Sequence, residues 1–212
     1  MADLSITVTN LETLLNSSTP ANLVEWTESE LYEYFDEAAK RLTRRFNVFV
    51  ERDTTTTIEL GTPSYSVPAG HVATIHVSVG VTDPIPDFVA LYPSTVGELE
   101  ALDADWVDST GTSDTWLHDL GTQTTRLYAS PDETVSGQSL AVIFNGYPET
   151  ITVESAVIES MPPVLQCYFL WHGLAEARRR ESDMAMPEVA AHFDERMKLV
   201  EKVIEQYWGA SQ

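Results

Sequence analysis

The feature that most constrains the fold is a change in the spacing of apolar residues along the chain. From Trp26 to Phe49 they recur every three or four positions, which is the period of an amphipathic helix. From Thr54 to about Thr152 the period becomes two, in short β-branched and aromatic stretches separated by turn residues. After Met161-Pro162-Pro163 the helical period returns. The sequence therefore predicts an α+β protein whose strands lie between helical segments.

The first long helix has a well-marked start. Thr27 is followed three residues later by Glu30, which is the spacing of a capping box. Trp26, directly before the cap, can fold onto Leu31 as a hydrophobic staple. These residues place the first helical turn immediately after Thr27.

Further helices are predicted on both sides of the strands. A short one is expected over Asn10–Asn16. The first helix after the prolines has an apolar stripe made of Val164, Cys167, Tyr168, Trp171, Leu174 and Ala175. The last helix opens at Pro187, with a stripe made of Val189, Phe193, Met197, Val200, Ile204 and Tyr207. The short connection Glu181–Met186 predicts an antiparallel hairpin, and we expect it to bundle with the first long helix.

The predicted strands fill the middle of the chain. They are Thr55–Leu60, Ser64–Val67, Val72–Val79, Phe88–Tyr92, Thr115–Leu120, Thr124–Ala129 and Ser139–Asn145. A helical turn is expected at Thr95–Leu102, with Ser94 as its cap. This order predicts a helical bundle with an inserted antiparallel β domain. We expect helical residues 1–53, the β domain over 54–160, and a completing helical hairpin over 161–212.

The formal net charge is −21, with 33 acidic and 12 basic residues. Eleven of the basic residues lie in Lys40–Arg52 or Arg178–Lys202, and residues 54–175 contain 15 acids against Arg126 alone. This balance argues against a nucleic-acid clamp, because phosphate contacts need an excess of Lys and Arg. Two interpretations of the acidic middle segment stay open: a solvated surface, or a face that does not retain passing DNA.

Residues that could carry chemistry form no recognisable constellation. The single cysteine, Cys167, lies among apolar residues and is expected to be a small core residue rather than a reactive thiol. His71 and His76 would point to opposite faces of one strand, so they do not predict a metal site. The carboxylates of Asp103–Asp108 lack the spacing of a calcium loop and are expected to form a surface turn with Trp106 pointing inward. We expect no enzymatic activity, no cofactor and no metal.

The sequence also shows no pattern typical of a targeting signal. The first ten residues have no basic segment followed by an apolar one, and no apolar run approaches the ~18 residues that span a bilayer. We therefore expect a chain that stays soluble where it is made, without a membrane partner.

Two features are candidates for contact with a partner protein. Arg178, Arg179 and Arg180 form the one basic cluster, either as favourable charges at a helix C-terminus or as a docking patch for an acidic neighbour. Helical spacing puts Tyr207 on the core stripe, so Trp208 is the better candidate for an aromatic anchor. Reversing the charge of the arginines is expected to weaken assembly more than folding.

Two stretches resemble phage head-to-tail adaptor (connector) proteins. Val24–Leu42 resembles the opening of the first long helix in that family, with Glu25 in place of its usual basic residue and Asp36 in place of its Asn. Ser94–Pro131, with the order EL, D-x-D-W, GT, W and RLY, is similar to a second signature of these proteins. Tyr65-Ser66-Val67-Pro68 and the closing helices extend the resemblance over most of the chain.

The resemblance implies a structural virion protein of the phage neck, assembled in the host cytoplasm. Members form rings below the portal, commonly of twelve copies, which bind the portal and the tail or next neck protein around a DNA channel. DNA would pass through that channel without specific binding.

Other classes of function stay open on the sequence alone. The strongest alternative is a β-sandwich module that binds carbohydrate or protein, using Trp106, Trp116 and Tyr128 as stacking surfaces. A hydrolase is the third interpretation, and it lacks a nucleophile, base or metal constellation.

Overall fold

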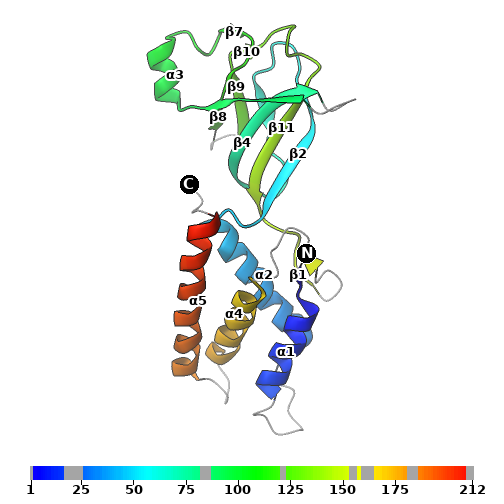
Figure 1. Cartoon of the computed structure of the whole chain (residues 1–212), viewed down its shortest axis with the longest axis vertical. Helices are drawn as coiled ribbons and strands as arrows, with labels where there is room; N and C mark the ends of the chain where they lie inside the picture. Colours follow the sequence, from blue (N-terminus) through cyan, green and yellow to red (C-terminus); the bar gives the residue numbers. More distant parts are fainter. Residues whose placement is uncertain are drawn as a thin grey trace. The chain divides into compact units, whose positions relative to one another are not determined.

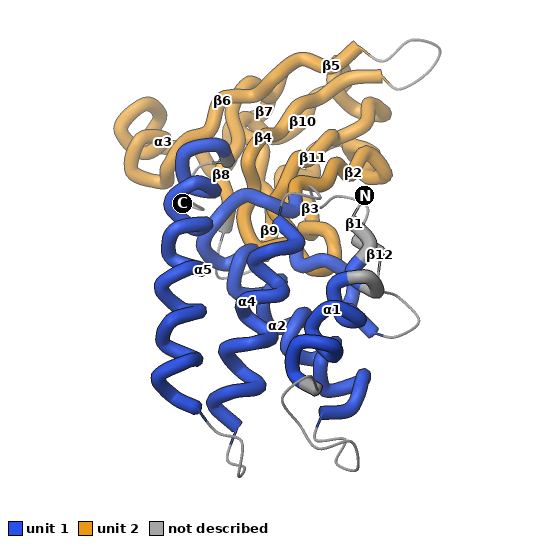
Figure 2. The backbone as a smooth tube through the Cα atoms, turned by 60° about the horizontal axis from the view of Figure 1, so that its bottom comes forward, with its two compact units in different colours: residues 1–49, 147–212 blue, residues 50–146 orange. Residues whose placement is uncertain are grey.

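The computed structural model of the chain describes residues 2–16, 26–81, 87–119, 123–152, 157–158, 165–180 and 186–208. Helices and mostly antiparallel sheets are both present, which confirms an α+β protein. The chain divides into two compact units (Figure 2). Residues 1–49 and 147–212 form the helical unit, and residues 50–146 form the β unit.

The helical unit is built around one central helix (Figure 1). Its helices are α1 (Ser5–Asn16), α2 (Glu28–Arg45), α4 (Gln166–Arg179) and α5 (Pro187–Trp208), and β1 (Ala2–Asp3) pairs antiparallel with β12 (Val157–Ile158). Helix α4 contacts α1, α2 and α5, and one apolar core joins all four. The core includes Leu11, Trp26, Phe35, Leu42, Tyr168, Phe169, Met197 and Ile204.

Close approach of the helices to α4 depends on Gly173. A Cβ atom built there would lie 2.6 Å from Leu11 Cδ2 and 3.1 Å from Phe35 Cε1. Both distances are shorter than ordinary van der Waals contact, so the missing side chain leaves room for α1 and α2.

The start of α2 confirms the predicted capping box. The Thr27 amide donates to Glu30 Oε2 at 2.8 Å, and the Glu30 amide donates to Thr27 Oγ1 at 3.3 Å. The predicted end at Phe49 is wrong, because Phe46 is an extended C-cap residue whose amide bonds to the Leu42 carbonyl at 2.8 Å. The apolar residues from Phe46 to Phe49 are buried in the core without being helical.

The short N-terminal helix begins at Ser5, five residues before the predicted start at Asn10. Leu4, Val8, Leu11 and Leu15 are all buried at helical spacing. The β-branched residues of this stretch disfavour a helix locally, and burial of the stripe outweighs that preference. The connection predicted at Glu181–Met186 lies, apart from Met186, outside the described residues.

The β unit contains two four-stranded sheets that share one core. One sheet has the order β2 (Val50–Thr57), β11 (Ser139–Gly146), β4 (His71–Val81) and β5 (Asp87–Ala90). The other has the order β3 (Ser64–Ser66), β9 (Thr124–Tyr128), β8 (Thr115–Asp119) and β6 (Tyr92–Pro93), and only its β6–β8 pair is parallel. Val77, Leu140 and Phe144 of the first sheet and Tyr65, Trp116 and Leu127 of the second are buried together.

Most predicted strands are present, with shifted ends. The first begins at Val50 rather than Thr55, because Val50 pairs with Asn145 of β11. The predicted strand Phe88–Tyr92 is divided between β5 and β6, and β7 (Thr110–Gly111) and β10 (Ser130–Pro131) form an additional short parallel pair. The sequence also predicts a turn at Asp83-Pro84, which lies outside the described residues.

A short helix, α3 (Val96–Leu102), interrupts the strands of the β unit. Its N-cap is Thr95 rather than Ser94, because Thr95 forms a capping box with Glu98 while the Ser94 hydroxyl donates to the same Glu98 carboxylate. Trp106 is buried with Leu99 of this helix, as predicted for an inward side chain.

Candidate interaction surfaces

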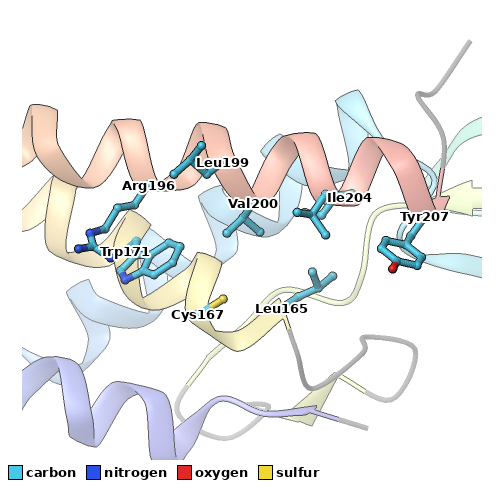
Figure 3. A pocket seen from close by; sticks show the side chains of 9 residues that line it. Leu165, Cys167, Trp171, Arg196, Leu199, Val200, Ile204 and Tyr207 are labelled. Carbon is cyan, nitrogen blue, oxygen red and sulfur yellow. The ribbon is translucent and has the colours of Figure 1, made fainter.

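An apolar groove lies on the helical unit between α4 and α5. It has a volume of about 540 Å³. Figure 3 shows Trp171 and Cys167 on the α4 side, facing residues of α5. The lining residues are Leu165, Cys167, Trp171, Arg196, Leu199, Val200, Val203, Ile204 and Tyr207.

The α5 side of this groove leaves large apolar side chains in contact with solvent. Leu199 is 62% exposed, Val203 is 49% exposed and Tyr207 is 77% exposed. They follow one another at intervals of four residues, which places them on one side of the helix. An exposed apolar stripe of this kind is a mark of a protein contact surface.

The predicted core stripe of α5 is therefore partly wrong. Met197 and Ile204 are buried, but Val189 and Tyr207 are exposed. The buried face is completed by Ala190 and by Glu201, an acidic residue that the hydrophobic pattern did not mark as core. The helix has a wide apolar surface, and only one side of it meets α4.

Burial of Glu201 is made possible by partners from two other helices. Its carboxylate accepts a hydrogen bond from Tyr168 Oη at 3.0 Å, pairs with Arg41 Nη2 at 3.1 Å, and pairs with Arg45 Nη1. Burial is the main cause that raises the pKa of Tyr168, so its hydroxyl stays protonated as a donor. The network ties α2, α4 and α5 together.

A second, polar hollow of about 520 Å³ lies beside this network. It is lined by Glu37, Lys40, Arg41, Arg44, Arg45 and His172. Burial, together with the nearby positive charges of Arg41 and Arg179, lowers the pKa of His172 to about 4. His172 is therefore neutral at pH 7.

The three consecutive arginines at the end of α4 point to three different partners. Arg178 is only 8% exposed and lies over the Trp26 ring at 5.7 Å. Arg179 pairs with Glu176 and with Asp194 of α5. Arg180 pairs with Glu30 at 2.9 Å, near the start of α2. All three contribute to contacts inside the helical unit, and their docking role stays a prediction.

Three other residues considered from the sequence are Cys167, Trp208 and His71. The expected core position of Cys167 is wrong, because the residue is half-buried and lines the groove between α4 and α5. Burial raises the pKa of its thiol, which favours the unreactive protonated form. The backbone of Trp208 ends α5, and its side chain lies outside the described part of the structure. His71 lies beside His118, with ring centroids 5.0 Å apart, a neighbour that strand periodicity alone did not identify.

The aromatic residues proposed as a stacking surface are turned inward. Trp116 belongs to the main β core, and Trp106 belongs to a smaller cluster against which Tyr128 packs. The Arg126 guanidinium covers the Trp106 ring at 4.8 Å. These rings offer little open face for a carbohydrate. Among the described residues, no group of three or more His, Cys, Asp or Glu could hold a metal ion.

Comparison with known families identifies the chain. The sequence model of the family described as SU10 adaptor protein matches residues 3–211. The chain belongs to this family. The SU10 adaptors are phage head-to-tail adaptor proteins, which confirms the resemblance seen in the two sequence signatures.

No curated protein matches this SU10 adaptor. Membership of the family supports a phage structural protein of the virion neck. None of the helices that the structure describes combines the length and the apolar character needed to cross a membrane.

One departure of this SU10 adaptor from the first signature has a visible role. Asp36, in place of the usual Asn, is buried on α2. Its Oδ1 accepts the Ile151 amide at 3.2 Å, and its Oδ2 pairs with Lys40 at 2.5 Å. Asp36 thus fixes the chain that re-enters the helical unit to α2. The position of Glu25 lies outside the described residues.

Proposed function

We propose that this SU10 adaptor is a non-enzymatic ring subunit beneath the portal, which links the capsid to the tail and continues the DNA channel. The observation that carries the proposal is the family match over residues 3–211, nearly the whole chain. The proposed ring contains identical copies, twelve as in the proteins that the sequence resembles. Its partners are the portal and the tail or next neck protein, in the virion after assembly in the host cytoplasm.

The exposed surfaces of the helical unit fit an assembling subunit. A ring subunit needs complementary surfaces on two sides, because a closed ring forms from head-to-tail contacts between copies. The α5 stripe of Leu199, Val203 and Tyr207 supplies one apolar surface in the described residues. Its side chains would be costly to leave in water if the chain acted alone.

The charge of the β unit fits a protein that DNA passes without binding. Residues 50–146 carry 14 acidic residues and only Arg52 and Arg126 as bases. Each arginine stacks on an aromatic ring, at 4.8 Å from Phe88 for Arg52 and from Trp106 for Arg126. A surface of this composition repels phosphate.

We also propose that the helical unit is a bundle into which the β unit is inserted. The packing of α1, α2 and α5 around α4 supports the bundle. The continuous span of the β unit, between two segments of the helical unit, supports the insertion. The domain limits at residues 53/54 and 160/161 stay predictions about independently folding parts.

Arg178, Arg179, Arg180 and Trp208 stay proposed partner contacts. Arg180 is the cleanest test, because Arg180→Glu loses a partly exposed ion pair worth at most about 1 kcal/mol. We expect its thermal stability to change little while its binding to portal rings weakens. A loss of thermal stability with unchanged portal binding would contradict a docking role.

Deleting the chain from a phage that carries it tests the proposed function. The expected product is capsids that package DNA but do not retain it or join tails, with recovery when the chain is supplied in trans. Normal tailed virions without the chain would contradict the proposal.

A further inference from the structure

We propose that the groove between α4 and α5 is the seat for residues 96–108 of a second copy of this chain. This inference rests on the proposed ring and names the surfaces that meet. The segment begins with α3 and continues through the turn that contains Trp106.

The groove defines the chemistry of its occupant. All its lining residues except Arg196 are uncharged. Arg196 Nε donates to His192 Nε2 at 3.0 Å, and its guanidinium lies 5.7 Å from the Trp171 ring centroid. Within the described residues Arg196 has no carboxylate partner. An occupant should therefore combine apolar side chains with a carboxylate.

Residues 96–108 have this combination on the exposed surface of the β unit. Leu102 is 75% exposed, and Val96 and Val107 are exposed as well. Glu98 is engaged in the Thr95 capping box, and Asp103 accepts bonds from Ser109 and Tyr128. Glu100 and Asp108 are exposed and have no basic partner within the described residues.

The groove and residues 96–108 are complementary in apolar character and in charge. Exposed Val96, one helical turn before Glu100 on the same side of α3, can fill the apolar groove beside Leu199, while Glu100 can pair with Arg196. An arginine held over an aromatic ring loses little side-chain freedom on binding, which favours such a pair. Because the groove and the segment are different surfaces, each copy could receive one neighbour and enter another, as a ring requires.

Paired cysteines test this contact directly. In a Cys167→Ser background, one chain carries Leu199→Cys and another carries Val96→Cys. The two chains are mixed, assembled on portal rings and treated with a short bismaleimide. We expect a cross-linked dimer only when both chains are present. Leu60→Cys, an exposed position elsewhere in the β unit, replaces Val96→Cys in the matched control and should give none.

The outcomes separate this inference from the proposed function. Failure of the unsubstituted chain to join portal rings would contradict the ring itself. Incorporation without a cross-link between the two positions would overturn the proposed seat while the ring stands. Cross-linking of the Leu199→Cys chain to itself would show a two-fold contact between grooves, which also overturns it.

A charge exchange gives a second test. Arg196→Glu should weaken assembly about tenfold by placing like charges at the contact, and Glu100→Arg should do the same. Combining both changes in one chain should restore assembly. Failure of the double variant to recover, when each single variant folds normally by circular dichroism, would contradict the pairing.

Discussion

The two units of this SU10 adaptor treat their charged residues in opposite ways. The helical unit contains 19 acidic and ten basic residues. Every ion pair of a lysine or arginine in the described part of the chain lies in this unit. In the β unit, Arg52 and Arg126 cover aromatic rings instead of pairing with carboxylates. The helical unit uses charge to join its helices, whereas the acidic residues described in the β unit have no basic partner.

This difference separates stability from assembly. Removing charges from the helical unit should change folding, because Glu201 and Arg178 are buried among their partners. Removing acids from the β unit should change solubility and association more than folding. The following substitutions test that division.

The largest expected loss of stability comes from removing a large side chain from the core of the helical unit. Phe169 is fully buried, and its ring meets Phe35 edge-to-face with centroids 5.9 Å apart. Phe169→Ala should lower the free energy of unfolding of the helical unit by about 3–5 kcal/mol. Hydrogen exchange measured by mass spectrometry should show faster exchange in α2 and α4 than in β4 and β11. Equal acceleration in both units would contradict their separate cores.

Acid should weaken the helical unit through His172. Its pKa in the folded protein is about 4, against 6.5 for an unperturbed histidine, so the unfolded chain binds the proton more readily. The contribution is complete above pH 6.5 and is lost as the pH falls towards 4, with a cost of about 3 kcal/mol at most. Thermal unfolding of His172→Leu should show a smaller drop over this window than exposed His192→Asn. Equal drops would show that another group dominates.

Glu201 tests whether the buried ion network stabilises the helical unit. Glu201→Gln removes the charge that Arg41 and Arg45 share, and the half-exposed arginines can then be solvated. The expected loss is therefore about 2 kcal/mol, below that of a fully buried pair. Denaturant unfolding measures it, with exposed Glu205→Gln as the control. An unchanged unfolding midpoint for Glu201→Gln would mean that the network orients the helices without stabilising them.

Substitutions in the two capping boxes should have the smallest effects on stability. Because each unit contains one such box, they allow the same change to be compared in both units. Thr27→Ala and Thr95→Ala each remove one side-chain acceptor, at the start of α2 and α3. Each should cost about 1 kcal/mol locally. Hydrogen exchange should report the first loss along α2 and the second only around α3. A global loss from Thr95→Ala would show that α3 supports more than its own cluster.

Local sequence patterns predicted where the helices and strands lie better than which side of each element is buried. The capping box of Thr27 and Glu30 and the inward Trp106 were predictable, because each depends on residues close in the sequence. The end of α2 was not, since Phe46, Val48 and Phe49 are apolar and buried after the helix has stopped. The spacing of apolar residues indicates which positions are buried, and here buried positions continue after the helix has ended.

The candidate interaction surface was harder to predict because it depends on which side of α5 meets α4. Tyr207 continues the apolar spacing of the helix yet lies exposed, while acidic Glu201 is buried. Only the positions of Arg41, Arg45 and Tyr168, from two other helices, explain that exchange. Sequence spacing contains no information on such long-range partners.

The mass of the chain measured with and without its portal tests the central claim most directly. A ring subunit should appear on portal rings as a closed set of identical copies, and the stoichiometry should be the same across preparations. A monomer whose mass is independent of concentration, and which never joins portal rings, would contradict the account.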